Sequence, residues 1–135
     1  MMVALVATLP DTTADLTPWN DWRLPVIVKE VDTELLEGPA LVAIEYSVIS
    51  GQEKMFVKAI RQYARLRRRD GAYRWGIYRD IEAADRFVEI FLVHSWAEHL
   101  RQHQRHTKAD RELEQRVYAY VAGEPKVRYL LYADS

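Results

Sequence analysis

Residues 86–107, RFVEIFLVHSWAEHLRQHQRHT, decide the fold of this chain. Six of the first ten residues are apolar, and these are aromatic, β-branched or leucine side chains, which is typical of a buried β-strand. Ser95 and Glu98 then stand three residues apart, which is the spacing of a capping box. In such a box the hydroxyl accepts a hydrogen bond from the third helical N–H, and the carboxylate reaches back. The stretch therefore predicts a strand over residues 86–95 and a helix that begins at about Trp96.

The same signals recur upstream of this stretch. Residues 40–49, ALVAIEYSVI, form a β-rich and partly alternating run that predicts the first strand. Ser50 and Glu53 repeat the capping-box spacing and predict the start of a helix. We expect this helix to end at Gly71, in a left-handed C-terminal cap. Residues 72–80 then predict the second strand.

Downstream, Thr107 and Asp110 form a weaker capping box, so a further helical segment is predicted from Lys108 to about Val121. Gly123 and Pro125 stop that helix, and residues 126–133 predict the last strand. The element order is β-α-β-β-α-β, with the second helix broken in two. This order predicts an α+β fold of the ferredoxin-like type with an antiparallel sheet, over residues 40–135.

The N-terminal region differs from the rest of the chain. Four of the five prolines lie in residues 1–39, and no helical or strand period runs far between them. We expect an extended arm or linker there. About eight of the first ten residues are apolar, but they are too few to span a bilayer, and this segment lacks the basic residues that open a signal peptide.

Composition excludes several classes of function. The chain has 135 residues, a formal net charge of -1 and no cysteine. Disulfides, thiolate chemistry and cysteine zinc sites are therefore absent, and the net charge gives no overall attraction to nucleic acid or anionic lipid. The arginine-rich run at residues 65–76 is interpreted as a helix C-terminus whose cations suit the helix dipole. We expect no nucleic-acid partner and a cytoplasmic location.

The third predicted strand is apolar on both faces. Alternate side chains point to opposite sides, with Phe87, Phe91 and Val93 on one face and Val88, Ile90 and Leu92 on the other. Helices on one side of a sheet cover only one face. We therefore expect a homodimer in which two sheets pack face to face and close a dimeric α+β barrel. The alternative is that the N-terminal arm covers this face in a monomer.

All four histidines lie between residues 94 and 106. His99 and His103 are one helical turn apart and could bring two imidazoles to one zinc ion. No glutamate lies between them, and His106 is roughly 10 Å farther along a helix from His99, too far for the same ion. We expect no metal site here, and at most one histidine lining a pocket.

Two long motifs carry a family resemblance. Residues 67–76, RRRDGAYRWG, and residues 87–103, FVEIFLVHSWAEHLRQH, resemble the C-terminal domain of secretion-effector or enterobactin-exporter-like transporters of the major facilitator superfamily. The resemblance covers roughly residues 10–132, and residues 15–25 are similar to the linker after the last membrane helix. It implies a soluble domain at the inner face of the membrane, in a fragment of a longer transporter or a free-standing relative.

The strand followed by SWAEHLRQH is also similar, more distantly, to the antibiotic biosynthesis monooxygenases, which are dimeric α+β barrels. Some of those enzymes oxidise aromatic molecules without a cofactor, and others degrade haem. The similarity implies roles for Trp96 at the strand–helix junction and for a histidine on the helix. Such enzymes often have an asparagine on the first strand, but the only asparagine here is Asn20, and the first strand offers Glu45 and Tyr46.

Three functional hypotheses follow. The first is a non-catalytic domain of a major-facilitator exporter that acts by dimerisation or by sensing a small hydrophobic or aromatic ligand. The second is a cofactor-independent monooxygenase, and the third is a stand-alone binding or structural barrel. We expect no cofactor. The candidate pocket consists of Tyr46, Trp75, Trp96, His99 and His103.

Overall fold

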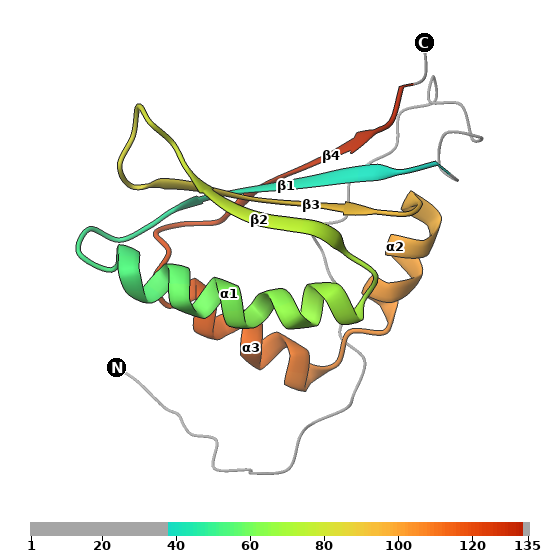
Figure 1. The fold of residues 1–135 in the computed structure, drawn as a ribbon. Coiled ribbons are helices and arrows are strands. Elements are labelled where there is room, and N and C mark those ends of the chain that lie inside the picture. Colours follow the sequence, from blue (N-terminus) through green and yellow to red (C-terminus); the bar gives the residue numbers. More distant parts are fainter. Residues whose placement is uncertain (1–37, 134–135) are drawn as a thin grey trace.

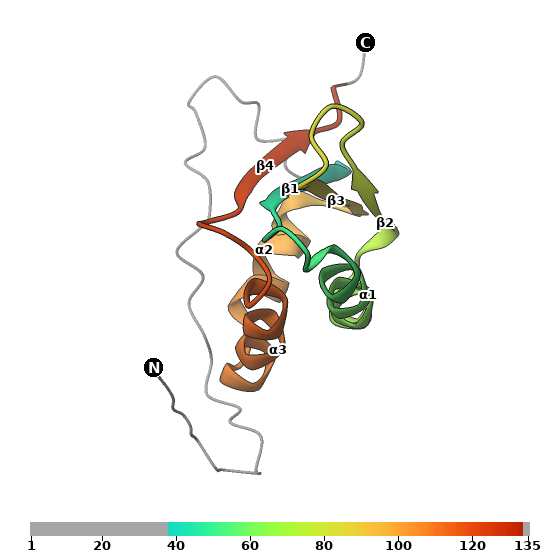
Figure 2. The ribbon, with the colours of Figure 1, turned by 90° about the vertical axis from the view of Figure 1, so that its left-hand side faces the viewer.

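The computed structural model describes residues 38–133, apart from the side chains of residues 103 and 104. This part of the chain forms a four-stranded sheet and three helices, and the helices lie on one side of the sheet (Figures 1 and 2). The elements are β1 (Ala40–Ser47), α1 (Glu53–Arg69), β2 (Tyr73–Arg79), β3 (Arg86–Val93), α2 (Trp96–Gln104), α3 (Lys108–Tyr118) and β4 (Lys126–Leu131).

The strand order in the sheet is β2-β3-β1-β4, and all neighbouring strands are antiparallel. Helix α1 connects β1 to β2 across β3, and the α2–α3 pair connects β3 to β4 across β1. The ferredoxin-like α+β fold predicted from the element order is thereby confirmed. The closure of two such sheets into a dimeric barrel stays a prediction.

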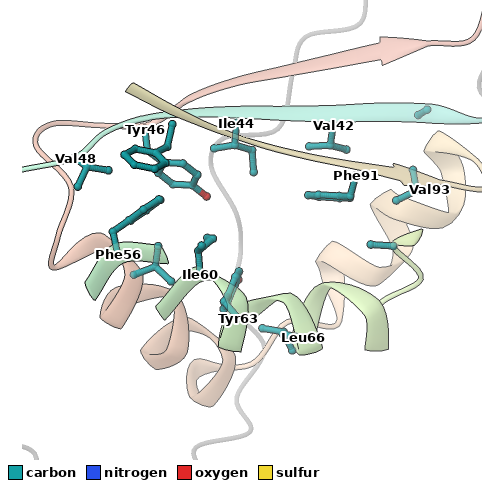
Figure 3. Close-up of a cluster of buried hydrophobic side chains, with 14 of the residues drawn as sticks. Val42, Ile44, Tyr46, Val48, Phe56, Ile60, Tyr63, Leu66, Phe91 and Val93 are labelled. Carbon is teal, nitrogen blue, oxygen red and sulfur yellow. The ribbon is translucent and has the colours of Figure 1, made fainter. Parts of the chain in front are cut away.

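The hydrophobic core lies between the sheet and the helices (Figure 3). Alternate residues of the two central strands point into it, as the period of two in a strand requires. The strands contribute Ala40, Val42, Ile44, Tyr46, Phe87, Phe91 and Val93, and α1 contributes Phe56, Ile60, Tyr63 and Leu66. The division of the third strand into two faces, with Phe87, Phe91 and Val93 inward, is confirmed.

Two of the predicted helix starts are confirmed by their hydrogen bonds. The Ser95 hydroxyl accepts a bond from the Glu98 N–H at 3.0 Å, so α2 begins at Trp96. Thr107 and Asp110 form a complete capping box for α3. Gly71 has a φ of 101°, which is the left-handed conformation expected after the end of α1.

The capping box predicted at Ser50 and Glu53 is wrong. The residue that precedes α1 is Gln52, and it makes no side-chain capping bond. The chain first turns tightly, because the Gln52 N–H donates to the Ile49 carbonyl and Gly51 adopts a φ of 87°. Ser50 lies in that turn, before the helix begins.

Several predicted elements are shorter in the structure. Helix α3 ends at Tyr118 and β1 ends at Ser47, and just beyond these ends Val48 and Val121 form an isolated β-bridge. The Ala122 N–H donates to the Ser47 carbonyl at 2.7 Å and reinforces this junction. The remaining strands differ from the predicted ranges by one or two residues at their ends. The predicted N-terminal arm lies almost entirely in residues 1–37, outside the described residues, and stays a prediction.

Candidate functional site

A buried carboxylate lies at the centre of the core. Glu89, on β3, has no exposed surface and receives hydrogen bonds from three elements. The Tyr46 hydroxyl of β1 donates at 2.8 Å, and the Trp75 indole N–H of β2 donates at 2.8 Å. Arg67 of α1 donates from Nε at 2.8 Å and from Nη2 at 3.0 Å. We call these four residues the Glu89 cluster.

The electrostatics of the Glu89 cluster favour the ionised pair. Burial by itself would raise the pKa of Glu89, but the charge of Arg67 and the hydrogen bonds from Arg67, Trp75 and Tyr46 hold it below its usual range. Burial, followed by the nearby Glu89 charge, raises the pKa of Tyr46 well above its usual value. Tyr46 therefore remains a protonated donor, and Glu89 remains an ionised acceptor.

The hydrogen-bonding capacity of Glu89 is already used. Each carboxylate oxygen accepts two bonds, and a carboxylate has about four acceptor sites. A group in this state has no acceptor left for a substrate proton. The arrangement fixes the relative position of β1, α1, β2 and β3, and buried ion pairs of this kind are costly to break.

Sequence reasoning missed Glu89 and Arg67, although one signal was available. Glu89 lies between Phe87 and Phe91 in the strand alternation, so it had to point into the core. A charged side chain at an inward position is almost never buried unless it is paired. Arg67 has no comparable signal, because it lies in a run with Arg68 and Arg69.

A second group of side chains lies where β3 leads into α2. The Trp96 ring is buried and packs edge-on against Tyr129 of β4, with centroids 4.9 Å apart. His99 is 8% exposed, and its ring lies 5.4 Å from Trp96 and 6.3 Å from Phe91. Beside His99 is a cavity of about 10 Å³, which Arg67, Phe91 and His99 help to line. This volume holds about one water molecule.

An ionic cluster joins the end of α1 to the start of α3. His106 Nε2 lies 2.6 Å from Asp70 Oδ2, and Arg69 donates to both Asp70 and Asp110. Burial opposes ionisation of Asp70, but the hydrogen bonds from His106 and Arg69 lower the pKa of Asp70 below its usual value. Asp110 also completes the capping box with Thr107. These contacts orient α3 against α1.

The predicted pocket residues fall into two groups. Tyr46 and Trp75 belong to the Glu89 cluster, whereas Trp96 and His99 contact each other at the other end of the core. Arg67 connects the groups, because its guanidinium carbon also lies 5.0 Å from the centre of the Phe91 ring. The side chain of His103 lies outside the described residues.

The remaining histidines do not converge. The exposed His94 ring stacks on Tyr73, with centroids 4.5 Å apart, while His106 contacts Asp70. Among the described side chains, no group of three or more histidine, aspartate or glutamate residues is placed to hold a metal ion. The expected absence of a metal site therefore stays a prediction for the whole chain.

Comparison with protein families gives one match. A family profile described as "Transmembrane secretion effector" matches residues 1–135. No protein with a curated description matches the chain. None of the described helices is both long enough and apolar enough to cross a bilayer.

Several solved structures share the fold. A Bordetella bronchiseptica protein provisionally described as an antibiotic biosynthesis monooxygenase is 21% identical, with a TM-score of 0.63 over 71% of this chain and 98% of its own. SnoaB, a cofactor-independent oxygenase from Streptomyces nogalater, is 12% identical, with a TM-score of 0.60 over 73% of this chain and 96% of its own. A conserved protein from Methanosarcina mazei is 13% identical, with a TM-score of 0.61 over 75% and 99%. At these identities the similarity establishes the fold alone.

Proposed function

Because the chain belongs to the transmembrane secretion effector family, we propose that it is a non-catalytic domain that serves an exporter by forming a homodimer at the inner face of the membrane. The observation that carries this proposal is the composition of the sheet face opposite the helices. We call it the open face, because no helix among residues 38–133 covers it (Figure 2).

The open face is apolar at one end of the sheet. Leu41 of β1 lies opposite Leu92 of β3 and Leu130 of β4, and Ala43 lies opposite Ile90. Leu130 is 44% exposed. The rest of this face carries charged side chains, because Arg128 lies opposite Ala43 and Lys126 lies opposite Glu45. An apolar patch bordered by polar residues is typical of a protein interface.

A second copy of the same face is the occupant we propose. Two open faces packed together would bury their leucine and isoleucine side chains against each other, at the spacing of about 10 Å between stacked sheets. Stable interfaces bury on the order of 1,600 Å², and permanent ones are more apolar than the rest of the surface. The fold shared with the structural neighbours is compatible with this arrangement.

The interior of the domain supports a non-catalytic role. The cavity beside His99 has a volume of about 10 Å³. Pockets for small organic molecules have volumes of about 300–1,000 Å³. The only fully buried carboxylate of the described residues, Glu89, already accepts four hydrogen bonds. Both features favour packing over chemistry at these positions.

Analytical ultracentrifugation of the chain and of Ile90→Asp tests the dimer. We expect the wild-type chain to sediment as a dimer at micromolar concentration. Ile90→Asp places a charge in the middle of the open face and should shift the protein to monomer, since an unpaired buried charge costs several kcal/mol. Circular dichroism will establish that the variant remains folded.

Ile81→Asp is the matched control. Ile81 is 100% exposed in the loop between β2 and β3, away from the strands of the open face, so the same substitution there should leave the dimer intact. A folded wild-type monomer at micromolar concentration would contradict the proposal. It would favour the alternative in which the N-terminal residues cover the open face.

The second candidate is an oxygenase that acts on an aromatic molecule. The contact between Trp96 and His99 beside the cavity favours it, and one structural neighbour is described as a cofactor-independent oxygenase. Oxygen-dependent turnover of an anthrone-type substrate above the spontaneous rate, lost in Trp96→Phe, would support this candidate. We expect no such turnover.

A further inference from the structure

Five basic residues form a line along the outer face of α1. Their spacing alternates between four and three residues, which keeps them on one side of a helix of 3.6 residues per turn. All five are exposed. We call this line the basic stripe, and its members are Lys54, Lys58, Arg61, Arg65 and Arg68.

The basic stripe has a single sign of charge. Helix α1 carries seven basic residues but only one acidic residue, Glu53, although the whole chain has 19 basic and 20 acidic residues. The salt bridges among the described residues involve other basic side chains and none of the stripe. Ordinary protein surfaces intersperse both signs of charge. The net charge of -1 therefore conceals a strongly positive face.

Trp75 of β2 lies along one flank of the basic stripe. Arg61 and Arg68 border an open groove of about 520 Å³ together with Trp75 at the edge of the sheet. The Arg68 guanidinium carbon lies 5.6 Å from the centre of the Trp75 ring. Tyr78 lies opposite Val88 in the strand pairing, so its side chain points to the open face and does not belong to the stripe.

Apolar side chains are exposed near the other end of the stripe. Met55 is 49% exposed in the first turn of α1, and Ile49 is 42% exposed just before the helix. Basic residues flanked by a tryptophan and by exposed aliphatic side chains are typical of surfaces that bind at the headgroup level of a membrane. Each Lys or Arg near an anionic leaflet strengthens binding by roughly fivefold.

We propose that the basic stripe, with the edge of Trp75 beside it, binds the anionic phospholipid headgroups of the membrane. This inference rests on the proposed function, which places the domain at the inner face of the membrane. The stripe extends over about 21 Å at 1.5 Å per residue. Cations in such a line cannot converge on one small anion, but they match an extended sheet of phosphates.

The lipid contact is compatible with the proposed dimer. Helix α1 lies on the side of the sheet opposite the open face (Figure 2). The same protomer can therefore use the open face for a second copy and the basic stripe for lipid. Electrostatic binding of this type also weakens as salt screens the charges, because the Debye length falls from about 10 Å at 0.1 M to about 3 Å at 1 M ionic strength.

Co-sedimentation with vesicles tests the proposal on the 135-residue chain. The vesicles contain phosphatidylcholine alone or phosphatidylcholine mixed with phosphatidylglycerol. The test variant is Lys58→Gln/Arg61→Gln/Arg65→Gln. The control is Arg101→Gln/Arg105→Gln/Arg116→Gln, which removes the same charge from exposed positions on or after α2 and on α3. Both variants keep residues 1–37, so any contribution from that region is the same in each.

We expect the wild type and the control to bind the phosphatidylglycerol vesicles in low salt and to dissociate at high salt. The stripe variant should bind them at least about tenfold more weakly, because three surface cations are removed. Binding to phosphatidylcholine alone should be weak for every protein.

Three results would overturn the proposal. The first is absence of wild-type binding to the phosphatidylglycerol vesicles, and the second is an equal loss of binding in the stripe and control variants. The third is displacement by millimolar inorganic phosphate at constant ionic strength, which would indicate a site for a free phosphate compound. Sedimentation of the stripe variant reports separately on the dimer, so failure of the lipid contact is distinguishable from failure of the proposed function.

Discussion

Arginine residues have different roles on the inner and outer faces of α1. Arg67 points into the domain, retains 10% exposure of its side chain and donates two hydrogen bonds to the buried Glu89. Arg68 follows it directly, lies on the exposed face and belongs to the basic stripe. One step along a helix turns the side chain by about 100°, which separates a buried ion pair from a solvated charge.

The comparison shows that the contribution of a charge to stability depends on its surroundings. In a buried pair both ions have lost their hydration, so removing one leaves the other without a partner or water. An exposed cation remains hydrated and contributes little to stability. The inner face of α1 therefore stabilises the fold. The charges of the outer face remain available to bind another surface.

The largest expected effect comes from breaking the Arg67–Glu89 ion pair on the inner face of α1. Arg67→Gln leaves Glu89 charged and without its cation in the core, so it should lower the free energy of unfolding by about 3–5 kcal/mol. Urea denaturation measures this change. Arg68→Gln is the matched control and should change the free energy of unfolding by less than about 0.5 kcal/mol. Equal effects of the two substitutions would mean that the inner and outer faces do not differ energetically.

A smaller effect is expected on acidification, which neutralises Glu89 but leaves its side chain and its partners in place. The pKa of Glu89 is lower in the folded protein than its ordinary value of 4.5. Its stabilising contribution is therefore complete above the unfolded pKa and is lost as the pH falls through the folded pKa. Stability should thus decrease with acid below about pH 4.5.

Glu89→Gln isolates this contribution. The variant lacks the carboxylate, so its free energy of unfolding should vary less with pH over the acidic range than that of the wild type. Asp70 and Asp110, whose pKa values are also lowered, contribute to both proteins and cancel in the difference. Parallel pH profiles for the two proteins would show that folding does not shift the pKa of Glu89.

The smallest of the three effects concerns Trp75, where the two faces of α1 meet. Its indole N–H donates to Glu89 inside the domain, while its ring lies beneath Arg68 outside. Trp75→Phe removes one of the four hydrogen bonds to the carboxylate and should cost about 1.5–3 kcal/mol, the range for a bond to a charged group. Thermal or urea unfolding measures this cost. A change below about 0.5 kcal/mol would imply that water or another donor replaces the indole.

The sequence determined the order of the elements and much of their placement. Alternation in residues 86–93 and the caps at Ser95 and Thr107 depend on neighbours within a few residues, so they are visible without the fold. Ser50 was misassigned because a turn closed by Gly51 precedes the helix, and turn geometry competes with capping for the same residues. The family resemblance also rested on contiguous motifs and is confirmed by the family match.

Only the tertiary structure decided which side chains meet. Glu89 finds its partners 14, 22 and 43 residues away, at Trp75, Arg67 and Tyr46. Such contacts depend on the strand order and on the helix packing, which no local pattern encodes. The candidate residues Tyr46 and Trp75 were found as aromatic side chains, but their shared partner was not. Burial depends on how the sheet and the helices pack together. The structure, and not the sequence, therefore separated the buried charge of Arg67 from the exposed charges of the basic stripe.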